Sequence, residues 1–69
     1  MVKKEPEIVT IAELRARNNK MSQQELAVAL GTTQTTVSFW EKDIGSISAP
    51  YLVKVCRYFG VSADKLLGI

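Results

Sequence analysis

The sequence predicts an all-α fold, a compact bundle of five short helices. Residues that cap helices recur along the chain, apolar residues follow them at helical spacing, and no segment shows the alternating pattern of a strand. With 69 residues, the chain is long enough for one small domain. We expect residues 1–9 to form a flexible arm and residues 10–69 to form the domain.

The first helix is predicted to begin after Thr10. Thr10 and Glu13 have the spacing of a capping box, in which each side chain accepts a hydrogen bond from a backbone N–H that has no partner within the helix. Ile11 and Leu14 are spaced to share one face, which we expect to be buried. Residues 18–20 are expected to end this helix.

The second and third helices are separated by a short turn. Ser22 and Glu25 repeat the capping box, and Gly31 stands where a helix often ends in a left-handed residue. Thr33 is suited to cap the third helix. The inner faces of the two helices are expected to hold Leu26, Ala27, Leu30, Val37 and Trp40.

The fourth helix is predicted to begin after Ser48, with Pro50 in its first turn. Gly60 ends this helix and Ser62 caps the fifth, while residues 43–47 form the preceding loop. The residues expected to face the core are Leu52, Val55, Cys56 and Phe59 in the fourth helix, and Leu66 and Leu67 in the fifth.

The second and third helices together have the pattern of a helix-turn-helix motif. Ala27 is small enough for the two helices to cross closely, and Gly31 supplies the positive φ of a sharp turn. Val37 is placed to fill the angle between the helices. Each position therefore has a steric reason within the motif.

With these residues, the chain resembles the Cro and phage-repressor class of helix-turn-helix DNA-binding domains. The resemblance is carried, in order, by MSQQELA at 21–27, LGTTQTTVS at 30–38, WE at 40–41 and FGVS at 59–62. It covers residues 10–68 and implies a lambda-repressor-like bundle of five helices. In this class the third helix lies in the major groove of DNA.

The resemblance implies that the outward side chains of the third helix contact DNA bases. These are Gln34, Thr35, Ser38 and Phe39. A glutamine amide can pair with N6 and N7 of adenine, and an outward phenylalanine can contact a thymine methyl group. For Phe39 the alternatives are packing at the end of the helix or a place in a protein interface.

Further contacts are expected with the DNA backbone. Gln23 matches a glutamine of the class that touches phosphate and steadies the glutamine on the third helix, and Thr33 and Lys42 are also candidates. The alternative for these three residues is ordinary capping and solvation. Glu41 matches an acidic residue of the class and is expected to form a structural salt bridge with Arg15.

The loop after the third helix lacks the basic residues that are frequent in this class. We therefore expect few phosphate contacts there, and Lys3 and Lys4 in the arm are candidates to replace them. An exposed apolar patch for a homodimer is expected instead, consisting of Ile44, Ile47, Tyr58, Leu67 and Ile69.

The predicted function is that of a sequence-specific DNA-binding transcriptional regulator, a repressor in the first interpretation, bound as a homodimer to a near-palindromic double-stranded operator. The sequence does not distinguish repression from activation, and the chain either dimerises weakly through the apolar patch or is a piece of a longer repressor. The alternative is a protein-interaction module that reuses the fold. A net charge of +2 does not by itself indicate nucleic-acid binding, so the prediction depends on the motif.

Other classes of protein are not expected. The chain has no histidine, one cysteine and no apolar run of about 18 residues that could cross a membrane. We predict no enzyme activity, metal, cofactor or small-molecule ligand, and no membrane partner. The single cysteine suits a reducing cytoplasm, and the resemblance implies a bacterial or phage-encoded protein.

Overall fold

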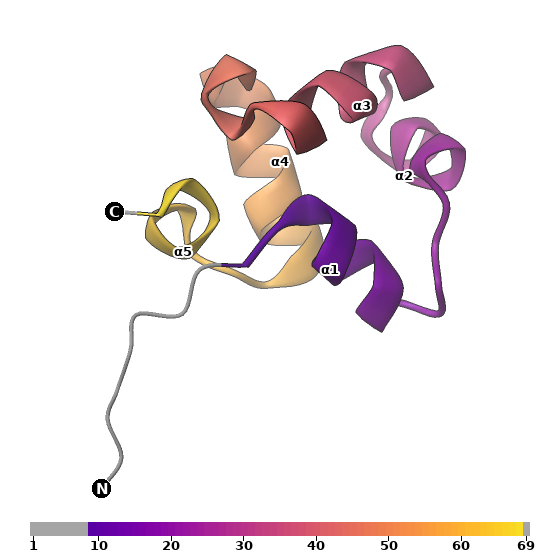
Figure 1. Ribbon diagram of the computed structural model, residues 1–69, viewed down its shortest axis with the longest axis horizontal. Helices are drawn as coiled ribbons and strands as arrows, with labels where there is room; N and C mark the ends of the chain where they lie inside the picture. Colours follow the sequence, from indigo (N-terminus) through magenta and orange to yellow (C-terminus); the bar gives the residue numbers. More distant parts are fainter. Residues whose placement is uncertain (1–8, 69) are drawn as a thin grey trace, which may run out of the picture.

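The computed structural model describes residues 9–68, whose regular elements are all helices, with no strand among them. The elements in order are α1 (Ile11–Arg17), α2 (Gln23–Leu30), α3 (Gln34–Lys42), the 3-10 helix η1 (Ile44–Ser46), α4 (Ala49–Phe59) and α5 (Ala63–Leu67). In Figure 1, α4 runs between α5 on one side and the α2–α3 pair on the other. The predicted all-α fold with five α-helices is confirmed.

Side-chain caps start four of the five α-helices. Both capping boxes are present, with Thr10 and Ser22 accepting from the backbone N–H groups of Glu13 and Glu25. Thr33 and Ser62 also cap their helices. At α4, Ser48 occupies the predicted N-cap position, but its side chain makes no capping hydrogen bond. The prediction that Ser48 caps this helix is therefore wrong.

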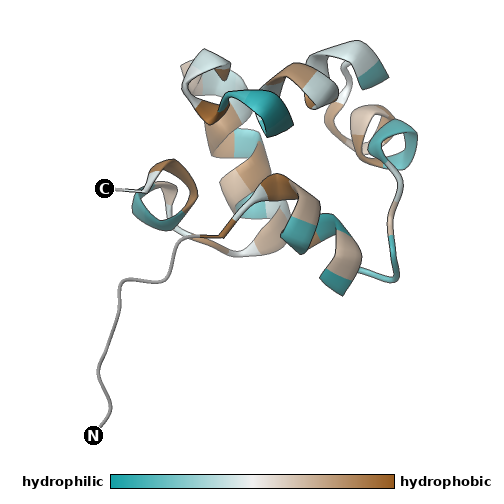
Figure 2. Cartoon of the chain, viewed as in Figure 1, coloured by the Kyte–Doolittle hydropathy of each residue, from teal (hydrophilic) through white to brown (hydrophobic). Residues whose placement is uncertain are grey.

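The core lies where all five α-helices meet. Its buried members are Val9, Ile11, Leu14, Leu26, Ala27, Leu30, Val37, Trp40, Val55 and Leu66. Hydrophobic and hydrophilic residues accordingly alternate along the helices (Figure 2). In the predicted stripe of α4 only Val55 is fully buried, because Leu52, Cys56 and Phe59 are packed against the core from its edge.

Val9 belongs to the folded domain rather than to the predicted arm. Its side chain is buried, and its backbone N–H donates to the carbonyl of Lys65 at 3.2 Å. This hydrogen bond ties the start of the domain to α5. The rest of the predicted arm, including Lys3 and Lys4, lies outside the described residues.

The predicted loop of residues 43–47 contains the short helix η1. The Asp43 side chain accepts from the backbone N–H of Gly45 at 3.1 Å and so fixes the first turn. Ile44 and Ile47 are partly buried against the core, so the expectation that they are exposed is wrong. The loop turns its apolar residues inward because the ends of α3 and α5 lie beside it.

Gly31 ends α2 in the left-handed region, with φ of 76° and ψ of 36°. A Cβ atom added there would meet no atom within 4 Å, so only the backbone conformation opposes a larger residue. We expect Gly31→Ala to lower the free energy of unfolding by about 1–2 kcal/mol. Chemical denaturation checks this value, with Gly31→Asn as a matched variant that costs less, because asparagine tolerates this conformation. Equal stability of Gly31→Ala and the parent chain would contradict the argument.

Candidate nucleic-acid interface

The helix-turn-helix is held rigidly by its own packing and by α4. Ala27 and Val37 have no exposed surface where α2 and α3 meet. From α4, the Tyr51 hydroxyl donates to the carbonyl of Gly31 at 3.2 Å, and Lys54 Nζ donates to the carbonyl of Leu30 at 3.3 Å. These bonds satisfy carbonyl groups at the end of α2, which carry partial negative charge. Neither contact is predictable from the sequence, because Tyr51 and Lys54 lie 20 and 24 positions beyond the residues whose carbonyl groups they bind.

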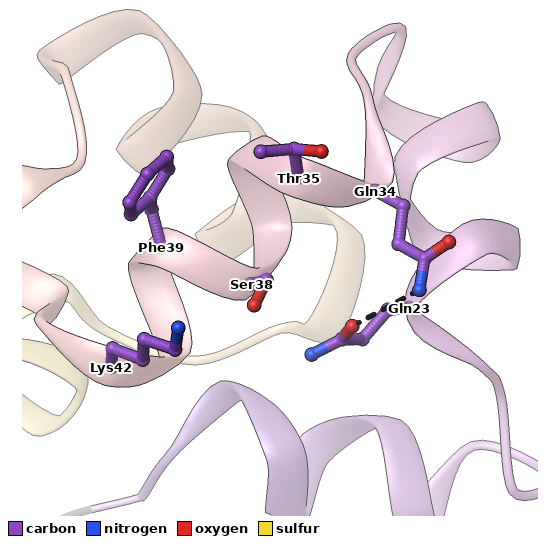
Figure 3. A pocket seen from close by; sticks show the side chains of 6 residues that line it. All are labelled: Gln23, Gln34, Thr35, Ser38, Phe39 and Lys42. Carbon is purple, nitrogen blue, oxygen red and sulfur yellow. Dashed lines mark hydrogen bonds between the residues drawn. The ribbon is translucent and has the colours of Figure 1, made fainter.

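The outward face of α3 forms an open hollow of about 370 Å³ together with the start of α2. Its lining residues are Gln23, Gln34, Thr35, Ser38, Phe39 and Lys42. Figure 3 shows these side chains spread along α3, with Gln23 facing Gln34 from α2. The hollow thus brings together six of the seven residues of the second and third helices that are predicted to contact DNA.

Thr33, the seventh, does not line the hollow. Its hydroxyl accepts from the backbone N–H of Thr36 at 3.2 Å and lies 3.0 Å from the Thr36 hydroxyl. The capping role proposed as the alternative for Thr33 is therefore present. The residue is still exposed at the start of α3, where N–H groups and the helix dipole favour an anion.

A chain of hydrogen bonds links α1 to the hollow, and we call it the relay: Arg15, Glu41, Gln23 and Gln34. Arg15 donates to Glu41 through Nε at 2.6 Å and through Nη2 at 3.0 Å. Gln23 Nε2 donates to Glu41 Oε1 at 2.9 Å, and Gln34 Nε2 donates to Gln23 Oε1 at 3.4 Å. The expected contact between Arg15 and Glu41 is therefore present, on side chains that are 18% and 14% exposed.

The relay also secures the turn between α1 and α2. Arg15 Nη1 donates to the carbonyl of Met21 at 2.9 Å, just before the Ser22 cap. One guanidinium therefore holds α3 through Glu41 and the entry to α2 through the backbone. Such planar, two-point contacts are characteristic of arginine and fix relative orientation.

The hollow offers chemistry suited to the edges of bases. It combines two amides, two hydroxyl groups, the ammonium of Lys42 and the ring of Phe39, which is 59% exposed. Amides and hydroxyls can donate and accept, and an apolar ring suits a methyl group. Among residues 9–68, no acidic side chain lines the hollow, so none of its lining residues repels a polyanion.

The described residues present little that suggests other chemistry. Between residues 9 and 68, no group of three or more histidine, cysteine, aspartate or glutamate side chains is placed to hold a metal ion. Burial raises the pKa of the Cys56 thiol, so the reactive thiolate is disfavoured near neutral pH. None of the described helices is long and apolar enough to span a membrane.

Among the described residues, those predicted for a dimer patch do not line one common hollow. Ile44 and Leu67 line a hollow with the start of α1, whereas Tyr58 borders other hollows beside α1, α2 and α4. Ile44 and Ile47 also pack against the core, which reduces the apolar surface available to a second copy. Ile69 lies outside the described residues.

The fold and the hollow define a helix-turn-helix protein whose third helix is presented outward. A family model described as Helix-turn-helix matches residues 11–66, which span α1 to α5. The chain belongs to this family, the Cro and phage-repressor type of DNA-binding regulators. No curated protein and no solved structure was found to match the chain.

Proposed function

We propose that the protein is a sequence-specific transcriptional repressor that binds a near-palindromic operator through the major groove. The observation that carries the proposal is the hollow on α3, where amides, hydroxyls, a ring and an ammonium meet and no acidic side chain of the described residues joins them. Bound at an operator, the domain would exclude polymerase from the promoter. The proposed setting is the cytoplasm of a bacterium, with a gene of bacterial or phage origin.

In this proposal α3 enters the groove, and Gln34 and its neighbours on the hollow face the bases. Gln34 pairs with adenine, Thr35 and Ser38 contact base edges or methyl groups, and Phe39 packs on a thymine methyl. Gln23, Thr33 and Lys42 contact phosphates on either side and set the depth of the helix. Two copies related by a two-fold axis occupy half-sites about one helical turn apart.

Selection of bound duplexes from a random DNA pool, at near-physiological salt, tests this function. An enriched inverted repeat is the expected result, and the mass of the protein–DNA complex gives the number of copies bound. Enrichment of a single half-site would remove the dimer from the proposal and retain specific binding. Absence of any enriched sequence with folded protein would overturn the proposal.

A protein-interaction module is the second candidate, and the exposed apolar side chains favour it. Phe39 is 59% exposed and Val28 is 70% exposed, although solvent-exposed apolar residues that stand alone are common. Interfaces between proteins favour aromatic and arginine anchors, whereas the neighbours of Phe39 in the hollow are threonine, serine and glutamine. We therefore prefer DNA as the partner.

Phe39 supplies a prediction about the part its ring takes in DNA binding. Replacing the thymine that faces it with deoxyuridine removes one methyl group, and we expect about 4-fold weaker binding from the lost apolar contact. The Phe39→Ala variant should bind the thymine and uracil duplexes equally. For each protein, titrations measure the affinity for the thymine duplex and for the uracil duplex, and the pair is repeated at each thymine of the selected half-site. The same discrimination by both proteins would show that Phe39 does not contact the methyl group.

A further inference from the structure

We propose that Glu41, which does not line the hollow, determines which base Gln34 selects. It acts through Gln23 and is a positioning residue for recognition. This inference rests on the proposed function, because it requires Gln34 to face a base. It concerns the direction of the hydrogen bonds in the relay rather than the strength of the Arg15–Glu41 pair.

The direction of the relay is set at Glu41. A carboxylate only accepts hydrogen bonds, so a glutamine beside it must present its Nε2 group. Gln23 does so, with Nε2 at 2.9 Å from Glu41 Oε1. The oxygen of the same amide is then the atom that Gln23 turns toward Gln34, and Gln34 must donate to it. Figure 3 shows the resulting contact between the two amides.

One N–H group of the Gln34 amide is bonded to Gln23. The amide therefore retains one N–H donor and one oxygen acceptor for DNA. Adenine presents one acceptor, N7, and one donor, N6, so it matches this set. Guanine presents two acceptors, N7 and O6, and would need both N–H groups of Gln34. Because Gln23 already occupies one of them, the relay favours adenine over guanine before DNA binds.

Replacing Glu41 with glutamine should reverse the relay. The single amide oxygen of the introduced residue is held by Arg15, which can only donate, and its amide nitrogen then faces Gln23. Gln23 responds by accepting through Oε1 and turning Nε2 toward Gln34, which accepts in turn. Both N–H groups of Gln34 are then free for the two acceptors of guanine.

The experiment uses the full chain and duplexes derived from the selected half-site. The adenine read by Gln34 is located as the position whose preference disappears in Gln34→Ala, and a second duplex carries guanine there. We expect the affinity ratio of adenine to guanine duplexes to fall by about 5- to 150-fold in Glu41→Gln, the range of one bidentate base contact. An unchanged ratio would overturn the inference.

Two matched variants separate positioning from structural support. Arg15→Lys retains the charge and leaves the Glu41 carboxylate as an acceptor, but it loses the two-point contact. It should lower the melting temperature and keep the adenine preference of the parent chain. In a Gln23→Ala background, Glu41 is no longer connected to Gln34 by hydrogen bonds. Adding Glu41→Gln should then change the adenine-to-guanine affinity ratio no further. A similar loss of preference in Arg15→Lys would assign Glu41 a structural role alone and overturn the inference.

Folding of the variants is checked by circular dichroism. Should Glu41→Gln not fold beside an unpaired Arg15, the double variant Arg15→Lys with Glu41→Gln supplies a more flexible cation that also can only donate, and so keeps the same reversed donor. Failure of the proposed function looks different: no duplex would then be enriched, and the parent chain would show no base preference for Gln34→Ala to remove. Loss of the adenine preference in Gln34→Ala, with an unchanged ratio in Glu41→Gln, rejects the inference and retains the function.

Discussion

Replacement of Trp40 with alanine is expected to lower the free energy of unfolding by about 3–5 kcal/mol. Trp40 lies on the inner face of α3 and is 3% exposed, so truncation leaves a cavity where α3 meets the core. Its ring also packs against Tyr51 of α4, with centroids 5.4 Å apart. A domain of this size has a total stability of only about 3–10 kcal/mol, so much of the protein would unfold at room temperature.

Urea denaturation followed by circular dichroism measures this loss, since Trp40 is the single tryptophan and its fluorescence disappears with the substitution. The preceding residue provides a matched control, because Phe39 is also aromatic but is 59% exposed on the opposite side of α3. Phe39→Ala should change stability by less than about 0.5 kcal/mol. Similar losses in the two variants would mean that Phe39 packs into the fold, as its alternative interpretation holds.

The contrast between Phe39 and Trp40 shows how much the sequence alone could reveal. Helix starts were predictable because the caps are local, and a threonine or serine followed by a glutamate three residues later satisfies the helix by itself. Inner faces were predictable because the spacing of apolar residues reflects the period of the helix. The outward residues of α3 were predictable for the same reason, since they lie away from its buried face.

Features that depend on distant partners were not predictable. The α1–α2 turn places Asn19 and Lys20 at φ of 58° and 56°. This left-handed conformation is unfavourable for lysine, so a lysine in the sequence gives no reason to expect it. The inward packing of Ile44 and Ile47 depends on how the loop lies over α5, and the missing cap at Ser48 depends on side-chain orientation. The relay likewise became visible only when α1, α2 and α3 were brought together.

The relay explains why Gln34 should matter for specificity more than for affinity. Replacing it with alanine removes one bidentate base contact but no charge, and the backbone contacts proposed for Gln23, Thr33 and Lys42 remain. We expect the preference for adenine at one position of the half-site to fall by about 5- to 150-fold. Binding to unrelated duplex DNA, which depends on phosphate contacts, should stay nearly unchanged.

Titrations with the selected operator, its three single-base variants at that position and unrelated DNA, all at one salt concentration, test this separation. Gln24→Ala is the matched control, because Gln24 is an exposed glutamine next to Gln23 that does not line the hollow. The control should retain the base preference of the parent chain. An equal loss of affinity for every duplex in Gln34→Ala would place Gln34 at the phosphates. Specificity would then have to come from the hydroxyls of Thr35 and Ser38 and the ring of Phe39.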